Sequence, residues 1–166
     1  MTKNKLTQEL KGVYRSPLGD IVLTSDGSAL TGLRFAEATN EEPAQVIPPL
    51  ADACRWLDLY FCGAKPDFTP LLAPQGTPFQ QSVWRELLTI LYGQTVSYGH
   101  IAKQISCRSA QAVGGAVGHN PIALIIPCHR VIGSNGHLTG YAYGLDREQW
   151  LLAHEVQSTG QPYDSK

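Results

Sequence analysis

The sequence predicts an α+β protein in which a small N-terminal α/β domain with a β-sheet precedes a mainly helical C-terminal domain. Apolar runs around a hairpin turn signal lie early in the 166-residue chain, whereas helical periodicity and helix-capping residues dominate its second half. Between the two, residues 64–76 contain three prolines and no useful periodicity. We therefore predict domains over residues 1–63 and 77–160, a linker over 64–76 and a tail over 161–166.

The N-terminal domain is predicted to contain a β-hairpin and one helix. Apolar residues stand on both sides of Asp26-Gly27, a strong hairpin turn signal: Ile21, Val22 and Leu23 before it, and Leu30, Leu33 and Phe35 after it. Farther along, four residues at spacings of four, three and four mark one face of a helix: Leu50, Cys54, Leu57 and Phe61. Gly63 can end that helix.

The C-terminal domain is predicted to begin with a capped helix. Thr77 followed by Pro78 is typical of an N-cap and a first-turn proline. Four apolar residues then mark one face: Phe79, Val83, Leu87 and Leu91. Gly93 can stop the helix.

Two short helices follow and predict a helix-turn-helix. Ser97 can cap a helix over residues 98–105, and Ser109 can cap another over residues 110–118. Six of the nine residues in the second helix are Ala or Gly. Glycine inside a helix costs about 0.5–1 kcal/mol relative to alanine, so a compensating reason is required. A close approach to a neighbouring helix or to a nucleic-acid groove would supply one.

The next segment is the strongest chemical candidate. An apolar run over residues 122–126 leads into Cys128-His129-Arg130. The thiolate is the nucleophilic form of cysteine, and neighbouring cations lower the pKa of the thiol. A packed cysteine beside a surface histidine is the alternative interpretation. Downstream, Asp146 and Gln149 form a capping-box pattern that would start a helix carrying Trp150, Leu151 and Glu155.

Composition excludes several classes of protein. The net charge is −1, so any polyanion is bound by individually placed contacts rather than by a broad basic face. The four cysteines form no CxxC pair and no zinc-binding spacing with histidine, so we expect neither a metal nor a cofactor. The sequence has no membrane-length apolar run and its first residues lead into no signal-peptide core. We expect a cytoplasmic protein that keeps its cysteines reduced.

Five stretches of the second half carry the pattern of a known family: VSYG at 96–99, NP at 120–121, IPCHRVIG at 126–133, GYA at 140–142 and WLLAHE at 150–155. They resemble the O6-alkylguanine-DNA alkyltransferases, and the resemblance covers most of residues 76–157. It implies a DNA-repair enzyme, a methylated-DNA–protein-cysteine S-methyltransferase, in which each molecule reacts once. The N-terminal half fits this family only in size and in its hairpin.

The resemblance also implies a mechanism. Cys128 is the nucleophile that attacks the alkyl carbon on O6 of guanine and keeps the alkyl group as a thioether. His129 acts through a water as the base that helps to form the thiolate, and Glu155 orients His129. This is the nucleophile–base–orienter logic of hydrolytic triads, applied to a carbon that leaves nothing to hydrolyse. The resemblance leaves open whether O4-alkylthymine is also accepted.

The pocket for the extruded base follows from the same resemblance. Tyr98 contacts the base and can supply a proton as guanine departs, since a phenol is a neutral donor. Asn120 bridges the recognition helix and the active-site turn. Tyr141 and the backbone N–H of Ala142 belong to a loop that closes over guanine. The pocket is completed by two further residues: Pro127 and Tyr143.

The implied partner is double-stranded DNA carrying O6-alkylguanine. Because the reactive atom is unreachable inside a duplex, the nucleotide is flipped out, and the small-residue helix enters the minor groove. Backbone phosphates are contacted from four positions: Tyr98, Gly99, Ser106 and Ser134. Gln111 and Arg130 complete the predicted DNA-binding set. We expect a monomer that associates with the nucleoid.

Two departures from the family pattern bear on this expectation. Gln111 stands where relatives usually have the arginine that replaces the flipped base, and glutamine lacks both the charge and the planar fork of arginine. Tyr143 stands where many relatives have glycine, so a bulky ring beside the pocket would restrict larger alkyl groups.

Three alternatives are weighed against this interpretation. Alkyltransferase-like proteins bind the lesion but lack the nucleophile, and Cys128 argues against them. A non-catalytic helix-turn-helix DNA-binding module would need a polar, base-reading helix, which residues 110–118 do not provide. A cysteine hydrolase would need an oxyanion hole and would turn over.

Overall fold

The computed structural model describes residues 9–37, 39, 42–43, 47–138 and 141–159. The chain divides into two compact units, Met1–Gln75 and Gly76–Lys166. A sheet-containing unit precedes a helical one, which confirms the predicted fold class. Gly140 and the predicted tail at 161–166 lie outside the described residues. Among the helices described, none is long and apolar enough to cross a membrane.

The first unit is built on a three-stranded antiparallel sheet in the order β1-β2-β3. The predicted hairpin corresponds to β2 (Gly19–Ser25) and β3 (Leu30–Ala36), joined through the turn at Asp26-Gly27. In that turn Gly27 has a φ of +98°, a left-handed conformation that glycine adopts without strain. Strand β1 (Leu10–Ser16), which was not predicted from the sequence, pairs along the whole of β2.

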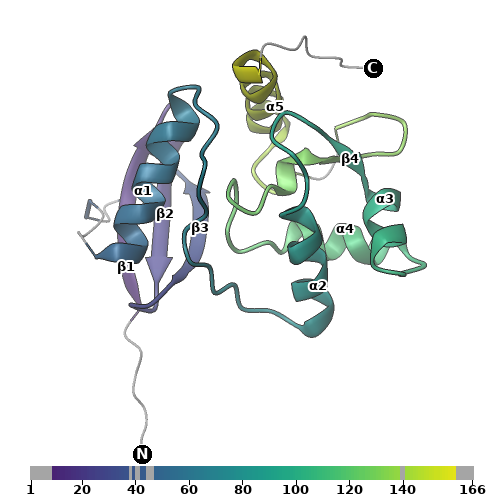
Figure 1. Ribbon diagram of the computed structural model, residues 1–166, viewed down its shortest axis with the longest axis horizontal. Helices are drawn as coiled ribbons and strands as arrows, with labels where there is room; N and C mark the ends of the chain where they lie inside the picture. The colour runs from purple at the N-terminus through teal and green to yellow at the C-terminus, as the bar shows by residue number, and fades with distance from the viewer. Residues whose placement is uncertain (1–8, 38, 40–41, 44–46, 139–140, 160–166) are drawn as a thin grey trace, which may run out of the picture. The chain divides into compact units, whose positions relative to one another are not determined.

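Helix α1 (Pro48–Phe61) covers one face of this sheet, as Figure 1 shows. The helix is confirmed, but its predicted face is shifted. Cys54 and Phe61 are not in the core. The buried residues instead follow the 3.6-residue period along a neighbouring stripe: Pro49, Leu50, Ala53, Trp56, Leu57 and Tyr60.

The segment predicted as a linker, residues 64–76, is largely part of the first unit. Leu30 at the start of β3 donates its backbone N–H to Leu71 and accepts one from Ala73, both at 2.8 Å. The Arg55 guanidinium lies 4.3 Å from the ring centroid of Phe68, a cation–π contact. The prolines thus mark a chain packed along the sheet unit, and this corrects the boundary to Gln75.

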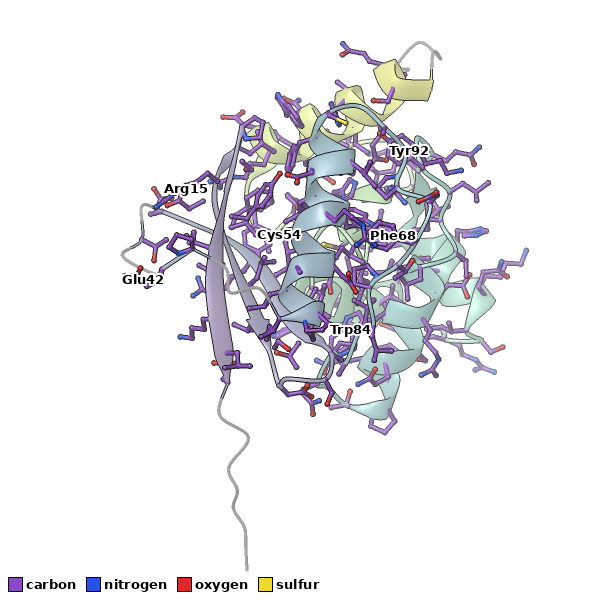
Figure 2. All side chains as sticks on the ribbon, turned by 60° about the vertical axis from the view of Figure 1, so that its left-hand side comes forward. Arg15, Glu42, Cys54, Phe68, Trp84 and Tyr92 are labelled. Carbon is purple, nitrogen blue, oxygen red and sulfur yellow. The ribbon has the colours of Figure 1, made fainter. Side chains whose placement is uncertain are left out.

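The second unit begins with α2 (Pro78–Leu87). Thr77 forms a full capping box with Gln80, which confirms the predicted helix start. The predicted apolar face is correct at Val83 and Leu87 but wrong at Phe79, whose side chain is exposed. Trp84 (Figure 2) is buried instead, and its indole N–H donates to the Ala116 carbonyl oxygen at 2.9 Å. The predicted stop at Gly93 is also wrong, because the helix ends at Leu87 and Leu91 lies beyond it with its side chain exposed.

The predicted helix-turn-helix consists of α3 (Tyr98–Gln104) and α4 (Ala110–Gly118). Ser97 and Ser109 cap them, each accepting a backbone N–H at 3.0 Å. The two helices contact each other and α2. The turn between them includes Ser106, a non-glycine residue with a φ of 57°.

The apolar run at residues 122–126 forms buried turns rather than a regular element. Leu124 has a φ of 69°, so the chain reverses direction at a fully buried leucine. The single-turn 3-10 helix η1 (Cys128–Arg130) follows, and then β5 (Val131–Ile132). Strand β5 runs parallel to β4 (Val96–Ser97), which brings the start of α3 next to η1.

Helix α5 (Leu145–Thr159) ends the described chain. It begins one residue before Asp146, so the prediction that Asp146 is the N-cap is wrong. Asp146 instead lies in the first turn, where a carboxylate favours the positive end of the helix dipole.

Candidate active site

Cys128 lines a small, partly open pocket in the second unit. Its walls come from the start of α3, the end of α4, η1, the loop before α5, and α5 itself. The pocket brings together six residues that the sequence singled out: Tyr98, Asn120, Cys128, Tyr141, Ala142 and Tyr143. Three further lining residues were not assigned to the pocket from the sequence: Val117, Gly118 and Glu148.

The thiol of Cys128 is buried at the base of η1. Burial raises the pKa of the Cys128 thiol to about 11, and hydrogen bonds from the Asn120 side chain and from backbone N–H groups offset only part of this rise. The resting cysteine is therefore a neutral thiol near pH 7. A nucleophilic thiolate requires a base that takes its proton.

Asn120 connects the end of α4 with the active-site turn. Its Nδ2 donates to the Ile126 carbonyl oxygen at 2.8 Å, and its Oδ1 accepts the Ile122 N–H at 3.0 Å. The side chain also bonds Cys128. One buried amide thus fixes the turns at residues 122–126 and the position of the sulfur.

His129, the residue after Cys128, forms a fully buried pair with Glu155. His129 Nε2 lies 2.5 Å from Glu155 Oε2. Burial lowers the pKa of His129, and the attraction of Glu155 for the charged form offsets only part of this. The imidazole is therefore neutral near pH 7, Nε2–H donates to the carboxylate, and Nδ1 keeps its lone pair. Nδ1 has no hydrogen-bond partner among the described residues.

Arg130 is the second partner of Glu155, and this corrects its assignment to DNA binding. Its Nε and Nη2 donate to the carboxylate at 2.8 and 3.1 Å, while Nη1 donates to the Ile90 carbonyl oxygen at 2.9 Å. Burial alone would raise the pKa of Glu155, but His129 and Arg130 outweigh it and hold that pKa well below its usual range. Arg130 is only 7% exposed, so it neutralises the interior instead of meeting a phosphate.

The loop before α5 closes the pocket with two aromatic rings. Tyr141 and Tyr143 meet edge to face with their centroids 5.7 Å apart. Arg147 in α5 donates to the Tyr143 carbonyl oxygen at 3.1 Å and so ties the loop to the helix. The ring of Tyr143 is thus part of the wall beside Cys128.

A wider groove runs outside the pocket along α3 and α4. Its lining includes four residues predicted to bind DNA: Tyr98, Gly99, Gln111 and Ser134. Ser106 lies in the exposed turn between the helices and does not line this groove. Pro127, predicted for the base pocket, is buried before η1 and is not part of the pocket lining.

The glycines of α4 are not required by packing within the described part of the chain. A Cβ built on Gly115 or on Gly118 meets nothing within 4 Å, and one on Gly114 makes ordinary contact with the Tyr98 ring. The bare surface of α4 therefore faces open space. This removes the neighbouring-helix explanation for Gly115 and Gly118.

Two family models match the chain. Residues 78–157 match the family model described as "6-O-methylguanine DNA methyltransferase, DNA binding domain", and residues 10–74 match "6-O-methylguanine DNA methyltransferase, ribonuclease-like domain". The chain belongs to the 6-O-methylguanine DNA methyltransferase family. Its N-terminal unit, which offered little evidence as sequence, is thus a family domain as well.

Individual relatives cover nearly the whole chain. A methylated-DNA–protein-cysteine methyltransferase of Mycobacterium bovis is 47% identical, over 90% of this chain and 92% of the relative. A methylated-DNA–protein-cysteine methyltransferase of Methanosarcina acetivorans is 45% identical, over 86% of this chain and 96% of the relative. The crystal structure of the Mycobacterium tuberculosis O6-methylguanine methyltransferase has a TM-score of 0.81 at 44% identity, over 95% and 97%. A structure of that protein in complex with DNA has a TM-score of 0.79 at the same identity, over 92% and 94%.

Glu148 is the titratable pocket residue of this methyltransferase that the sequence did not predict. A signal was present. Glu148, Leu151, Leu152 and Glu155 follow the spacing i, i+3, i+4, i+7, the pattern of one buried helical face. Two carboxylates on the buried face of a single helix are rare unless each is paired or functional. No group of three or more His, Cys, Asp or Glu residues in the described chain is arranged to hold a metal.

Proposed function

We propose that this protein repairs DNA by direct reversal, moving an alkyl group from O6 of guanine to Cys128 in a single irreversible event. The observation that carries the proposal is the arrangement around the thiol. Cys128 lines a pocket, and the next residue, the neutral His129, donates a hydrogen bond to the ionised Glu155. The family membership and the relatives named as methyltransferases support the same reaction.

Activation of the thiol follows from the tautomer of His129. The Cys128 proton passes through a water to Nδ1, and the imidazolium formed is stabilised by the Glu155 carboxylate at Nε2. The sulfur then attacks the alkyl carbon as the bond from that carbon to O6 breaks. The electron pair stays on guanine, and Tyr98 shares its proton with the leaving base.

The product explains why each molecule reacts once. A thioether carbon is not an acyl group, so water has no carbonyl to attack and the protein is not regenerated. A cysteine hydrolase would instead release its product and continue. The distinction lies in the electrophile and not in the Cys128–His129–Glu155 arrangement, which both reactions could use.

The groove along α3 and α4 is the proposed contact surface for the DNA minor groove. Gly114 lines this groove, and Gly115 and Gly118 on the same helix present backbone that no other part of the described chain covers, which allows a close approach to a narrow groove. Gln111 lines the groove, which supports a role in filling the gap left by the flipped base. Exposed Lys103 and Arg108 supply charge for phosphates in place of the buried Arg130. We propose that the protein acts as a monomer.

The pocket favours small alkyl groups. Tyr143 contributes a ring to the wall, where it is braced by Tyr141 and by Arg147. We therefore propose methyl as the preferred group, with benzyl and other bulky groups transferred more slowly.

Analysis of the DNA strand tests the reaction class. A duplex carrying O6-methylguanine is incubated with excess protein, digested to nucleosides and separated by chromatography. Direct reversal predicts guanosine restored in an intact strand. Release of a free base or a strand break would indicate excision and would contradict the proposal.

A further inference from the structure

Glu148 is a buried carboxyl group that has no role in the reaction steps proposed above. It is 1% exposed, and its Oε1 has no hydrogen-bond partner among the described residues. The residue lines the same pocket as Cys128 and Tyr98. A buried acceptor without a partner destabilises a fold, so its presence in a reaction pocket indicates a partner that arrives with the ligand.

Burial keeps a substantial fraction of Glu148 in the acid form near neutral pH. The titratable residues that share its pocket are Tyr98 from α3, Cys128 from η1, and Tyr141 and Tyr143 from the loop. Arg147, the neighbouring cation in α5, donates to the Tyr143 carbonyl oxygen. Burial raises the pKa of Glu148 to about 7, and burial also raises the pKa values of Tyr98, Tyr141 and Cys128. Glu148 is thus the pocket group whose charge changes near neutral pH.

The chemistry of the lesion supplies the missing partner. Ordinary guanine presents two neighbouring donors, N1–H and the N2 amine. Alkylation at O6 removes the proton from N1 and makes that atom an acceptor beside the same donor. A carboxylic acid is complementary to this edge, since its O–H donates to N1 and its C=O accepts from the amine. A carboxylate is complementary only to unmodified guanine.

We propose that Glu148 is a substrate-contacting residue of the base pocket, whose acid form pairs with the N1 and N2 edge of the flipped O6-alkylguanine. The assignment rests on the proposed function and deepens it. It gives the pocket a means to tell the alkylated base from guanine. In its acid form, Glu148 also places no negative charge beside the Cys128 sulfur while the thiolate forms.

Single-turnover transfer from a duplex carrying O6-methylguanine, measured from about pH 6 to about pH 9, tests this in three variants. Glu148→Gln keeps a donor and an acceptor but cannot ionise. It should match wild type at about pH 6 and exceed it about tenfold at about pH 8, where only about a tenth of Glu148 holds its proton. Glu148→Leu should be about tenfold slower than Glu148→Gln at every pH. Asp146→Asn, an exposed acid in the same helix, should follow wild type throughout.

The outcomes distinguish a contact between Glu148 and the base from a purely electrostatic effect of Glu148 on the Cys128 thiolate. If Glu148→Leu behaves like Glu148→Gln, the residue acts only by repelling the thiolate and the contact is refuted. A constant ratio of Glu148→Gln to wild type across pH also refutes it. If wild type itself transfers no methyl, the proposed function fails first and the contact fails with it.

Carbon NMR of the Glu148 carboxyl group tests the proposal without a chemical reaction and without a substitution of Glu148. It uses the Cys128→Ala variant, in which nothing can react. Adding the O6-methylguanine duplex should move the midpoint of the Glu148 titration to higher pH, because the bound base favours the acid form. The unmodified duplex should leave this midpoint unchanged. An unchanged midpoint with a bound lesion would overturn the proposal.

Discussion

Glu155 accepts the Nε2–H of His129 at 2.5 Å, and Nδ1 of the same ring has no hydrogen-bond partner among the described residues. The same carboxylate accepts bonds from Arg130 and from the Gly93 N–H at 3.0 Å. One residue thus sets the tautomer of the base and neutralises a buried cation. These two roles make Glu155 both a stability residue and a positioning residue.

Glu155→Gln should therefore destabilise the fold and slow transfer. Removing one member of a buried ion pair leaves Arg130 uncompensated, at a cost of about 3–5 kcal/mol in the free energy of unfolding. Denaturant unfolding at about pH 7 measures this, with the exposed Asp146→Asn expected within about 0.5 kcal/mol of wild type.

The pH dependence of stability provides a second check on Glu155. Because its pKa in the fold lies below its ordinary value, its contribution is complete above the unfolded pKa and is lost as pH falls through the folded pKa. Wild type should lose this stability in acid, and Glu155→Gln should show a weaker acid dependence. Equal acid dependence in both proteins would contradict the assignment.

Cys128→Ala should abolish transfer and leave binding to an O6-methylguanine duplex nearly unchanged, because the groove residues lie on α3 and α4. Fluorescence anisotropy with a labelled duplex measures the binding. Cys62→Ala, at an exposed cysteine of the first unit, is the matched control and should retain full transfer. Alkylation that persists in Cys128→Ala would refute the choice of nucleophile.

Gly115 separates the stability of α4 from its fit to DNA. Gly115→Ala should stabilise the protein by about 0.5–1 kcal/mol, since the new Cβ meets open space and alanine is the better helix former. Gly115→Leu should fold equally well but weaken duplex binding by about tenfold or more, because its side chain would enter a minor groove only about 6 Å wide. Equal affinity of all three proteins would show that DNA does not approach this face.

Gln111→Arg should speed transfer from duplex DNA. Arginine adds a charge in the negative minor groove and a stiff planar fork beside the orphaned cytosine, a gain of about 1 kcal/mol or several-fold in rate. Free O6-benzylguanine needs no flipping, so its slower reaction should not change. A parallel change with both substrates would place Gln111 in the pocket or in folding instead.

Local signals in the sequence predicted much of the second unit. Ser97, Ser109 and Thr77 each bond the backbone N–H that a cap residue is expected to bond. Such contacts span three residues, so the sequence contains all the information they need. The shifted face of α1 and the exposed Leu91 show the limit, because burial depends on partners distant in sequence.

The errors in the site have the same origin. Arg130 follows His129 directly, and its charge suggested a phosphate contact. Its actual partner, Glu155, is 25 residues away. Glu148 was missed because a glutamate in a helix is ordinarily a solvated residue, and only the packing of α5 against the pocket buries it.

Mass spectrometry of the protein tests the central claim most directly. The chain is incubated with an excess of duplex carrying O6-methylguanine, digested with trypsin and analysed peptide by peptide. Transfer to Cys128 predicts one added methyl group, on the peptide that contains this cysteine, and no further loss of O6-methylguanine after one equivalent. Continued consumption of the lesion by protein with an unmodified Cys128 would contradict the account.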